Sequence, residues 1–274
     1  MEGVHRPVSA PGGENPLRPA GTAPTVARVL KRIEAFYDAV PRSSARAEDF
    51  GPLTLFVQEG RGWPYYARPA LGHTGEVPIA AVEKVRARQR ELGVPEAFEW
   101  VAETAPGLRA AVEASGLTVH EHPLMVLAGE GGAVADPEGV TVRVVEADDP
   151  GLESAVAAPY GAFGATPEPG AAERVAGRIR AGYTRLAAAF DASGTALAAG
   201  QHQAVGTVSE VVGVGTLPQA RRRGLGLAVT AALVADARAR GVELVFLTAS
   251  DGDVARLYGR LGFRTVATAL IAEA

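Results

Sequence analysis

Six consecutive residues, Arg221 to Gly226, have the most specific chemical pattern in the sequence, Arg-Arg-Arg-Gly-Leu-Gly. They follow an apolar segment that stops at Pro218, and they open a segment with the length and composition of a helix. Glycine allows backbone N–H groups to approach an anion closely, and a helix N-terminus adds a favourable partial positive charge. Three neighbouring arginines can contact further phosphate oxygens. The pattern predicts a phosphate-binding turn; the alternative is a solvated turn whose glycines only permit tight geometry.

Two common phosphate-binding motifs are excluded at this loop. No Gly-Lys-Ser or Gly-Lys-Thr follows the glycines, so the loop is not a P-loop. The Gly-x-Gly-x-x-Gly fingerprint of dinucleotide-binding folds is absent, and no acidic residue lies at the distance that this fingerprint requires.

The loop resembles a signature of the GNAT acyltransferases, a superfamily that moves an acyl group from acyl-coenzyme A to an amine. That signature, Gln/Arg-x-x-Gly-x-Gly/Ala between the fourth strand and the next helix, is matched by Arg221-x-x-Gly224-x-Gly226. A second signature, a helix ending in Leu-Tyr-x-x-x-Gly-Phe, is matched by Leu257 to Phe263. The resemblance is strong over 140–274. Over 25–128 the sequence is similar to a degenerate partial copy, as in tandem members of the superfamily.

The resemblance implies that acetyl-CoA is the acyl donor, and it assigns the residues that would hold it. Backbone groups of Val214, Gly215 and Thr216 would pair with the pantetheine arm like an added strand. Loop amides would hold the pyrophosphate; they belong to Arg221, Arg222, Arg223, Gly224, Leu225 and Gly226.

Asp251 is a weaker assignment to the cofactor site. It falls where many members of the superfamily have an asparagine that touches the cofactor, and an acidic side chain departs from that pattern. The alternative is helix capping, because Ser250 and Asp253 have the spacing of a capping box.

The resemblance assigns Tyr258 as the general acid that returns a proton to the departing coenzyme A thiolate. A hydroxyl with a pKa of about 10 can donate to a developing thiolate without being ionised at neutral pH. The structural alternative is a helix tyrosine that packs on the sheet.

Glu210 is the candidate general base. It lies 14 residues before Gly224, where the histone-modifying branch has its catalytic glutamate. Strand alternation predicts that Glu210 shares a face with Val212, Val214 and Thr216. A carboxylate beside a sheet core has a raised pKa and can accept a proton from an ammonium substrate. The alternative is a strand-edge charge in solvent.

Other polar and aromatic candidates have structural alternatives. Phe246 stands on the fifth strand where other subfamilies have their base, which excludes that arrangement. His202 either lines an acceptor groove or is a satisfied structural group. His120 and His122 alternate onto one strand face without further ligands, so no metal is expected. The aromatic residues of 63–66 form either a wall of the site or a packed hairpin. No Ser/His/Asp arrangement is predicted.

Length and composition are those of an ordinary globular chain. The 274 residues are 47% hydrophobic and 21% charged, which excludes a wholly disordered chain. A net charge of −4 provides no overall positive field for nucleic acid or anionic lipid. The absence of cysteine excludes disulfides and thiolate nucleophiles. Neither a membrane span nor a signal peptide is readable, so we expect a cytoplasmic protein that binds neither membrane nor nucleic acid.

Hydrophobic periodicity and turn signals predict the elements that must position these residues. We expect helices at 25–40, 79–92, 107–114, 152–162, 171–181, from the glycine loop to 240, and at 253–261. We expect strands at 53–58, 63–66, 97–101, 117–127, 140–145, 185–191, 196–204, 208–217, 242–249 and 263–271. This order predicts an α/β fold, with a GNAT-like mixed central sheet flanked by helices in the C-terminal half and a smaller degenerate GNAT-like N-terminal half.

The chain is predicted to comprise two related halves. Residues 1–24 are a disordered tail, 25–128 a degenerate GNAT-like domain, 129–139 a glycine-rich linker and 140–274 a GNAT N-acetyltransferase domain. Segments 96–127 and 242–271 match at an offset of 146, which indicates duplication. The glycine loop has no counterpart before the helix at 79–92, so one acetyl-CoA site is expected.

The leading hypothesis is an acetyl-CoA-dependent N-acetyltransferase that moves an acetyl group directly to a primary amine of a small molecule or peptide. The alternative is a non-catalytic acyl-CoA-binding regulatory protein, which the retention of Tyr258 disfavours. A third hypothesis, a structural partner module, requires that the loop bind no coenzyme A. The sequence leaves open the acceptor, the role of the N-terminal half, and whether the chain forms a homodimer.

Overall fold

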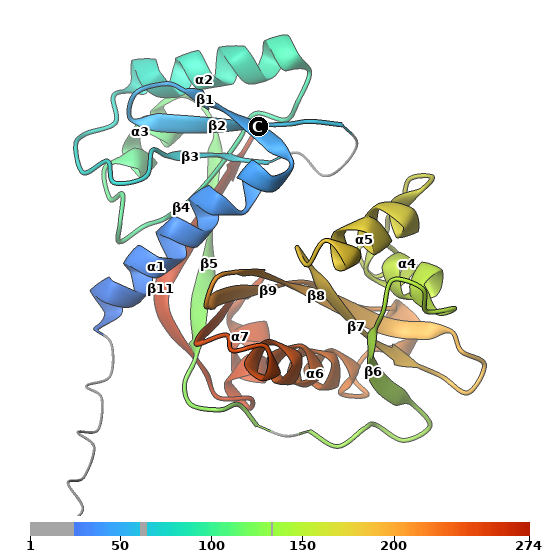
Figure 1. The fold of residues 1–274 in the computed structure, drawn as a ribbon. Coiled ribbons are helices and arrows are strands. Elements are labelled where there is room, and N and C mark those ends of the chain that lie inside the picture. The colour runs from blue at the N-terminus through green and yellow to red at the C-terminus, as the bar shows by residue number, and fades with distance from the viewer. Residues whose placement is uncertain (1–24, 61–64, 133) are drawn as a thin grey trace, which may run out of the picture.

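The computed structural model describes residues 25–60, 65–132 and 134–274, and arranges them around one mixed sheet of eleven described strands (Figure 1). The strand order is β1-β2-β3-β4-β11-β5-β10-β9-β8-β7-β6. The strands are β1 (Ala45–Asp49), β2 (Leu53–Gln58), β3 (Ala67–Pro69), β4 (Ala97–Val101), β5 (Thr118–Leu127), β6 (Thr141–Val145), β7 (Arg185–Phe190), β8 (Ala196–Val205), β9 (Val208–Thr216), β10 (Leu244–Thr248) and β11 (Phe263–Glu273). The helices are α1 (Val26–Ala39), α2 (Ile79–Leu92), α3 (Leu108–Ala114), α4 (Leu152–Ala162), α5 (Ala171–Arg180), α6 (Leu225–Ala239) and α7 (Gly252–Gly259).

The predicted α/β fold is confirmed, and most predicted elements differ from the observed ones by no more than two residues at either end. Helix α2 has the predicted bounds, and Gly93 ends it in the left-handed conformation with φ 66°. Gly241, with φ 80°, follows the end of α6 in the same way. Turn chemistry and helical periodicity were therefore sufficient to locate these boundaries.

Two predictions in the first hairpin region fail. The strand predicted at 63–66 is wrong in its described part, because Tyr65 and Tyr66 are irregular and β3 begins at Ala67; residues 63 and 64 lie outside the described residues. Strand β1 was not predicted, because it is a polar edge strand in which only Ala45 is buried.

Helices cover both faces of the sheet, and α1 crosses its centre (Figure 1). Helices α6 and α7 pack on one face of the C-terminal half, α4 and α5 pack on the other, and α2 and α3 cover the N-terminal half. The apolar face of α1, including Ile33 and Phe36, packs against residues of β4, β5, β9, β10 and β11. This helix therefore joins the two halves. None of the described helices has both the length and the apolar character needed to cross a membrane.

The two halves exchange their last strands. Strand β5 pairs antiparallel with β10 and β11, while β11 also pairs with β4. The units β4-α3-β5 and β10-α7-β11 are each strand-helix-strand, as the internal sequence match predicts. Under the offset of 146, Trp100 corresponds to Phe246 and Leu124 to Leu270. Trp100 pairs with Leu270, so an exact repeat would pair Phe246 with Leu124. Phe246 pairs instead with Val126, a difference of two residues in register. The sheet runs through both halves, and the domain boundaries stay a prediction.

The sheet opens between β9 and β10. These strands are parallel partners only from Leu244 to Phe246, opposite Val208 to Glu210. Beyond Phe246, β10 continues to pair with β5 through Leu247 and Thr248, while β9 continues to pair with β8. A gap in the hydrogen-bond ladder therefore begins directly after Glu210.

A Ser-His-Asp arrangement lies between β8, β9 and α6, although none was predicted. His202 Nδ1 is 2.9 Å from Ser209 Oγ, and its Nε2 is 2.9 Å from Asp236 Oδ2. Ser209 is completely buried and donates its proton to the carbonyl of Gln203. A substrate has no access to this serine, so the structural interpretation of His202 is confirmed.

Candidate active site

A β-bulge in β9 follows Glu210. Gly213 has φ 61°, a left-handed conformation that glycine adopts without steric cost. Ala199 of β8 pairs with Gly215 of β9, and the next pair is Gln201 with Val212. Between these pairs β8 moves by two residues and β9 by three. Strand β9 therefore has one extra residue at this point.

The bulge reverses the direction of the side chains that follow it. Val214 packs in the core beneath α6, and Thr216 lies against the start of the same helix. Glu210 and Val212 instead line a large cavity on the opposite side of the sheet. The predicted common face of Glu210, Val212, Val214 and Thr216 is therefore wrong, because strict alternation does not continue through a bulge.

The gap between β9 and β10 contains a groove of about 570 Å³. Beyond Glu210, the edge of β9 that faces β10 has no strand partner among the described residues, so its backbone groups are available to an extended ligand. The buried hydroxyl of Thr248 on β10 also has no hydrogen-bond partner in the described structure. Predicted site residues that line the groove are Glu210, Val214, Gly215, Thr216, Arg221 and Tyr258.

Gly215 is constrained by packing as well as by the groove. A Cβ at this position would lie 2.8 Å from the Cα of Pro159 and 2.9 Å from the Cβ of Ala162, both in α4. Helix α4 therefore approaches β9 closely enough to exclude any larger residue there.

The loop before α6 presents a row of unpaired backbone donors. Arg222 has φ 64° and is the one described non-glycine residue with a positive φ. Gly224 also has a positive φ, of 80°. The first helical hydrogen bond runs from the N–H of Ala228 to the carbonyl of Gly224, and the N–H groups of 222–227 have no acceptor within the described structure. Such turns at a helix N-terminus form anion-binding concavities, and strained backbone of this kind clusters at functional sites.

The arginine side chains of this loop contribute differently. Arg221 donates through Nη2 to the carbonyl of Ala162 at 2.8 Å, which ties the loop to α4. Arg223 donates to the carbonyl of Glu138 at 3.2 Å. Arg222 is exposed and makes no side-chain contact of this kind in the described structure. The backbone amides and the Arg222 guanidinium are therefore the donors of this loop that stay available to an anion.

Asp251 is the N-cap of α7. Its Oδ1 accepts hydrogen bonds from the N–H groups of Asp253 at 2.8 Å and Val254 at 2.9 Å. These bonds, the one to Val254 foremost, lower the pKa of the Asp251 carboxyl. The predicted capping box begins one residue too early, because Ser250 donates to Asp251 and does not cap the helix. Contact between Asp251 and a cofactor stays a prediction.

Tyr258 is positioned by α7 at the groove. The side chain is 8% exposed, and its ring meets Phe263 edge to face at 6.1 Å between centroids. Burial raises the pKa of Tyr258, while the Thr230 hydroxyl acts in the opposite direction. The phenol is therefore protonated at neutral pH, the state that a proton donor needs.

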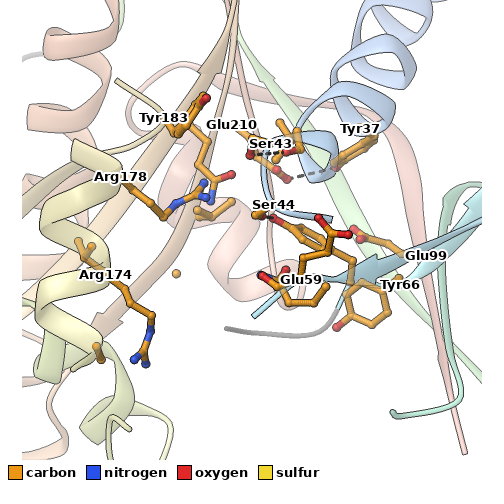
Figure 2. Close-up of a pocket in the computed structure, with 18 of the residues that line it drawn as sticks. Tyr37, Ser43, Ser44, Glu59, Tyr66, Glu99, Arg174, Arg178, Tyr183 and Glu210 are labelled. Carbon is orange, nitrogen blue, oxygen red and sulfur yellow. Dashed lines mark hydrogen bonds between the residues drawn. The ribbon is translucent and has the colours of Figure 1, made fainter. Parts of the chain in front are cut away.

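Glu210 belongs to a buried network that sequence reasoning missed. Tyr37 of α1 donates to Glu210 Oε1 at 3.2 Å (Figure 2). The Tyr37 ring also meets the Phe246 ring edge to face, with 5.4 Å between centroids. The guanidinium of Arg68 lies 3.7 Å from the centroid of the Tyr37 ring and pairs with Glu99 at 2.9 Å. Arg68 thus pairs directly with Glu99 and acts on Glu210 only through its electrostatic field.

This environment favours the neutral form of Glu210. Burial, and after it the nearby Glu99 carboxylate, raise the pKa of Glu210 to about 8 against the opposing effects of Arg68 and the Tyr37 hydrogen bond. A base with a pKa near the working pH combines a useful ionised fraction with the strength to take a proton from an ammonium group.

A second cavity, of about 1150 Å³, meets the groove at Glu210, Val212 and Gly213. Five of the six tyrosines of the chain line it, Tyr37, Tyr65, Tyr66, Tyr160 and Tyr183, and the sixth, Tyr258, lines the groove. Of the two interpretations of the aromatic residues at 63–66, the favoured packed hairpin is wrong for Tyr65 and Tyr66, because both line this cavity; residue 63 lies outside the described residues. Both halves of the chain contribute to the cavity, so the N-terminal half forms part of its wall.

Sequence reasoning missed Tyr37, Arg68 and Glu99 because each belongs to an element that reads as ordinary. Tyr37 continues the apolar stripe of α1, and Arg68 and Glu99 lie in short strands. The one signal in the sequence was the presence of two charged residues, Arg68 and Glu99, within short apolar segments, which is typical of a buried ion pair. Their contact with residue 210 depends on how α1 and the two halves pack.

Comparison with known proteins gives a consistent result. Residues 190–271 match the FR47-like protein family, and this segment contains the glycine loop and the Leu257–Phe263 signature. A structure described as a GCN5-related N-acetyltransferase from Kribbella flavida is similar with a TM-score of 0.71 at 27% identity, covering 89% of this chain and 95% of that one. No curated protein matches significantly.

Two further solved structures share the fold over most of the chain. A GCN5-related N-acetyltransferase from Sphaerobacter thermophilus has a TM-score of 0.62 at 18% identity, covering 92% of this chain and 94% of that one. A tandem GNAT protein from the clavulanic acid biosynthesis pathway has a TM-score of 0.55 at 17% identity, covering 81% of this chain and 78% of that one.

The chain thus has the fold of the GNAT acetyltransferase structures, which it shares with a tandem GNAT protein, and residues 190–271 match the FR47-like family.

The pKa of Glu210 predicts how stability depends on pH. Because its folded pKa is above the unfolded value, the folded state binds more protons between pH 4.5 and 8, and stability falls as pH rises through this window. Glu210→Gln removes this term while keeping the hydrogen bond from Tyr37. The parent should lose roughly 4 kcal/mol of stability relative to the variant between pH 5 and pH 9, measured by urea unfolding at each pH. The exposed Glu59→Gln should give no such trend, and a parallel pH dependence of Glu210→Gln and parent would contradict the raised pKa.

Proposed function

We propose that this protein is an acetyl-CoA-dependent N-acetyltransferase that moves an acetyl group directly to a primary amine. One observation carries the proposal: the groove between β9 and β10 and the tyrosine-lined cavity meet at Glu210, a carboxyl group with a raised pKa. This arrangement supports a donor arriving from one side and an acceptor from the other.

The chain's residues fit acetyl-CoA. The unpaired edge of β9 from Val214 to Thr216 can pair with the amides of pantetheine, and Thr248 offers an unused hydroxyl beside it. The free amides from Arg222 to Gly226 can hold the pyrophosphate at the N-terminus of α6, while the N–H of Arg221 donates to the carbonyl of Pro218 at 3.4 Å. Bound acetyl-CoA would supply a thioester, whose carbonyl carbon is the site that the amine attacks.

Glu210 takes a proton from the ammonium group of the acceptor, directly or through one water. Nitrogen then attacks the thioester carbon, forming the N–C bond. A backbone N–H near Val214 stabilises the oxyanion, because donors fixed before the reaction lose nothing in reorganisation. The C–S bond breaks, and Tyr258 gives its proton to the departing sulfur. The nitrogen, which still carries one proton more than an amide, loses it through water to the tyrosinate, and Glu210 releases its own proton to water.

We also propose the domain division used in the sequence analysis, with 25–128 as the degenerate half, 129–139 as a linker and 140–274 as the acetyltransferase half. The location of the glycine loop in 140–274 supports one donor site per chain.

The first test is coenzyme A binding by calorimetry, with one site expected per chain. Gly224→Ala forces a side chain into a left-handed position at the start of α6, closes the anion concavity and should weaken binding at least tenfold. Gly241→Ala is its control, because Gly241 has the same φ of 80° at the other end of α6 and an added Cβ meets nothing within 4 Å. Each substitution should cost about 1–2 kcal/mol of stability. Equal affinities of a folded Gly224→Ala and Gly241→Ala would reject the loop assignment.

The second test is Tyr258→Phe, which removes one oxygen and keeps the ring against Phe263. A positioned acid contributes about 10²–10⁴-fold, so kcat should fall at least roughly tenfold and kcat/KM in parallel, while acetyl-CoA affinity stays near that of the parent. Free-thiol release against a panel of primary amines measures turnover. If the tyrosine is only structural, stability changes and kcat per folded molecule does not. Acetyl-CoA binding without any accepted amine would instead support the non-catalytic alternative.

The third test is the pH dependence of kcat/KM. If Glu210 is the base, the rate rises with pH to a plateau, with an acidic limb at about pH 8. Tyr37→Phe removes a hydrogen bond to the carboxylate and should move this limb to higher pH. Glu99→Gln removes a nearby negative charge and should move it to lower pH. Shifts in the same direction, or none, would assign the base elsewhere.

A further inference from the structure

The large cavity has two walls of opposite charge. Arg174 and Arg178 project from α5 on one side, and Glu59, Glu99 and Tyr66 lie on the other (Figure 2). The α5 wall belongs to the C-terminal half of the chain and the acidic wall mostly to the N-terminal half. A ligand in this cavity therefore meets both halves at once.

Pairing within the walls leaves two groups uncompensated. Arg68 is paired with Glu99 at 2.9 Å, and Arg174 lies 3.5 Å from Glu168. Arg178 has no carboxylate partner among the described residues and lies over the Tyr183 ring at 5.8 Å. Glu210 lies at the junction with the groove and has only the Tyr37 hydroxyl as a partner.

The rest of the lining suits a ligand that carries a cation at one end. Tyr65, Tyr66 and Tyr160 line the same cavity as Glu210, and tyrosine faces attract ammonium groups. The Glu59 carboxylate stands at the exposed rim of the same wall and adds negative charge there. Arg178 places a positive charge on the α5 wall, where an anionic group of the ligand would give it the ion-pair partner that it lacks among the described residues.

We infer that the acceptor is a zwitterionic amine, with a primary amino group that enters toward Glu210 and an anionic group, a carboxylate or phosphate, that pairs with Arg178. This inference rests on the proposed function and names its substrate class. The carboxylate or phosphate fixes the acceptor's orientation, and the amine reaches the donor groove where the two cavities meet. A simple alkylamine leaves Arg178 unpaired and binds less well.

The experiment compares matched acceptors that differ only in the distal group. The series contains ω-amino carboxylates with two to eight methylene groups, their methyl esters and the corresponding phosphonates, which separates chain length from charge. Initial rates of thiol release give kcat and KM. We expect at least one length at which the acid or phosphonate has a KM about tenfold below its ester, with the better of the two identifying the anion.

Arg178→Gln should abolish this preference by raising KM for the anionic acceptors about tenfold, leaving the esters and kcat unchanged. Arg180→Gln is the matched control, because Arg180 lies on the same helix, is exposed and is not among the cavity residues. Equal KM values for acids and esters, or an equal effect of Arg178→Gln on both, would overturn the inference.

A binding measurement separates this inference from the proposed function. Thermal shift without acetyl-CoA should show stabilisation by the preferred ω-amino carboxylate or phosphonate but not by its ester, and Arg178→Gln should remove it. Failure of coenzyme A to bind rejects the proposed function. Normal coenzyme A binding together with equal shifts for acids and esters rejects only the zwitterionic acceptor.

Discussion

The parting of β9 and β10 is the constraint on which the rest of the structure depends. Two parallel strands that begin as partners separate after Glu210 and Phe246, which exposes hydrogen-bonding backbone in the middle of a sheet. Such a gap persists only if each strand is held on its other side. Strand β8 holds β9, and β5, donated by the other half of the chain, holds β10. Strand exchange is thus a mechanical condition of the groove.

Helix α1 secures the closed end of the gap. Phe36 and Tyr37 pack edge-on against Phe246, with centroid distances of 5.1 and 5.4 Å, so an aromatic cluster covers the last paired residues of β10. The same tyrosine reaches Glu210 with its hydroxyl. One helix therefore anchors the sheet and completes the environment of the candidate base, and changes in its packing should alter stability and the pKa of Glu210 together.

The sequence predicted what is local and missed what depends on packing. The glycine loop, Tyr258 and nearly all element bounds follow from motifs and periodicity, because the relevant residues lie within a few positions of one another. The bulge at Gly213 was within reach, since an isolated glycine in a strand pattern indicates one, but strict alternation was applied instead. The network of Tyr37, Arg68 and Glu99 was out of reach because 173 positions separate Tyr37 from Glu210.

The N-terminal half has a structural role at the groove and the large cavity. Strand β3 has three residues and meets β4 only at Ala67 and Phe98, and α2 begins after Pro78 without a glycine-rich loop. This half therefore lacks the long open edge and the anion concavity of its counterpart. It supplies β5 to hold β10 beside the groove, Glu99 and Tyr37 to shift the pKa of Glu210 in opposite directions, and the acidic wall of the large cavity. These contributions are made by packing and charge, so they require no ligand bound in this half.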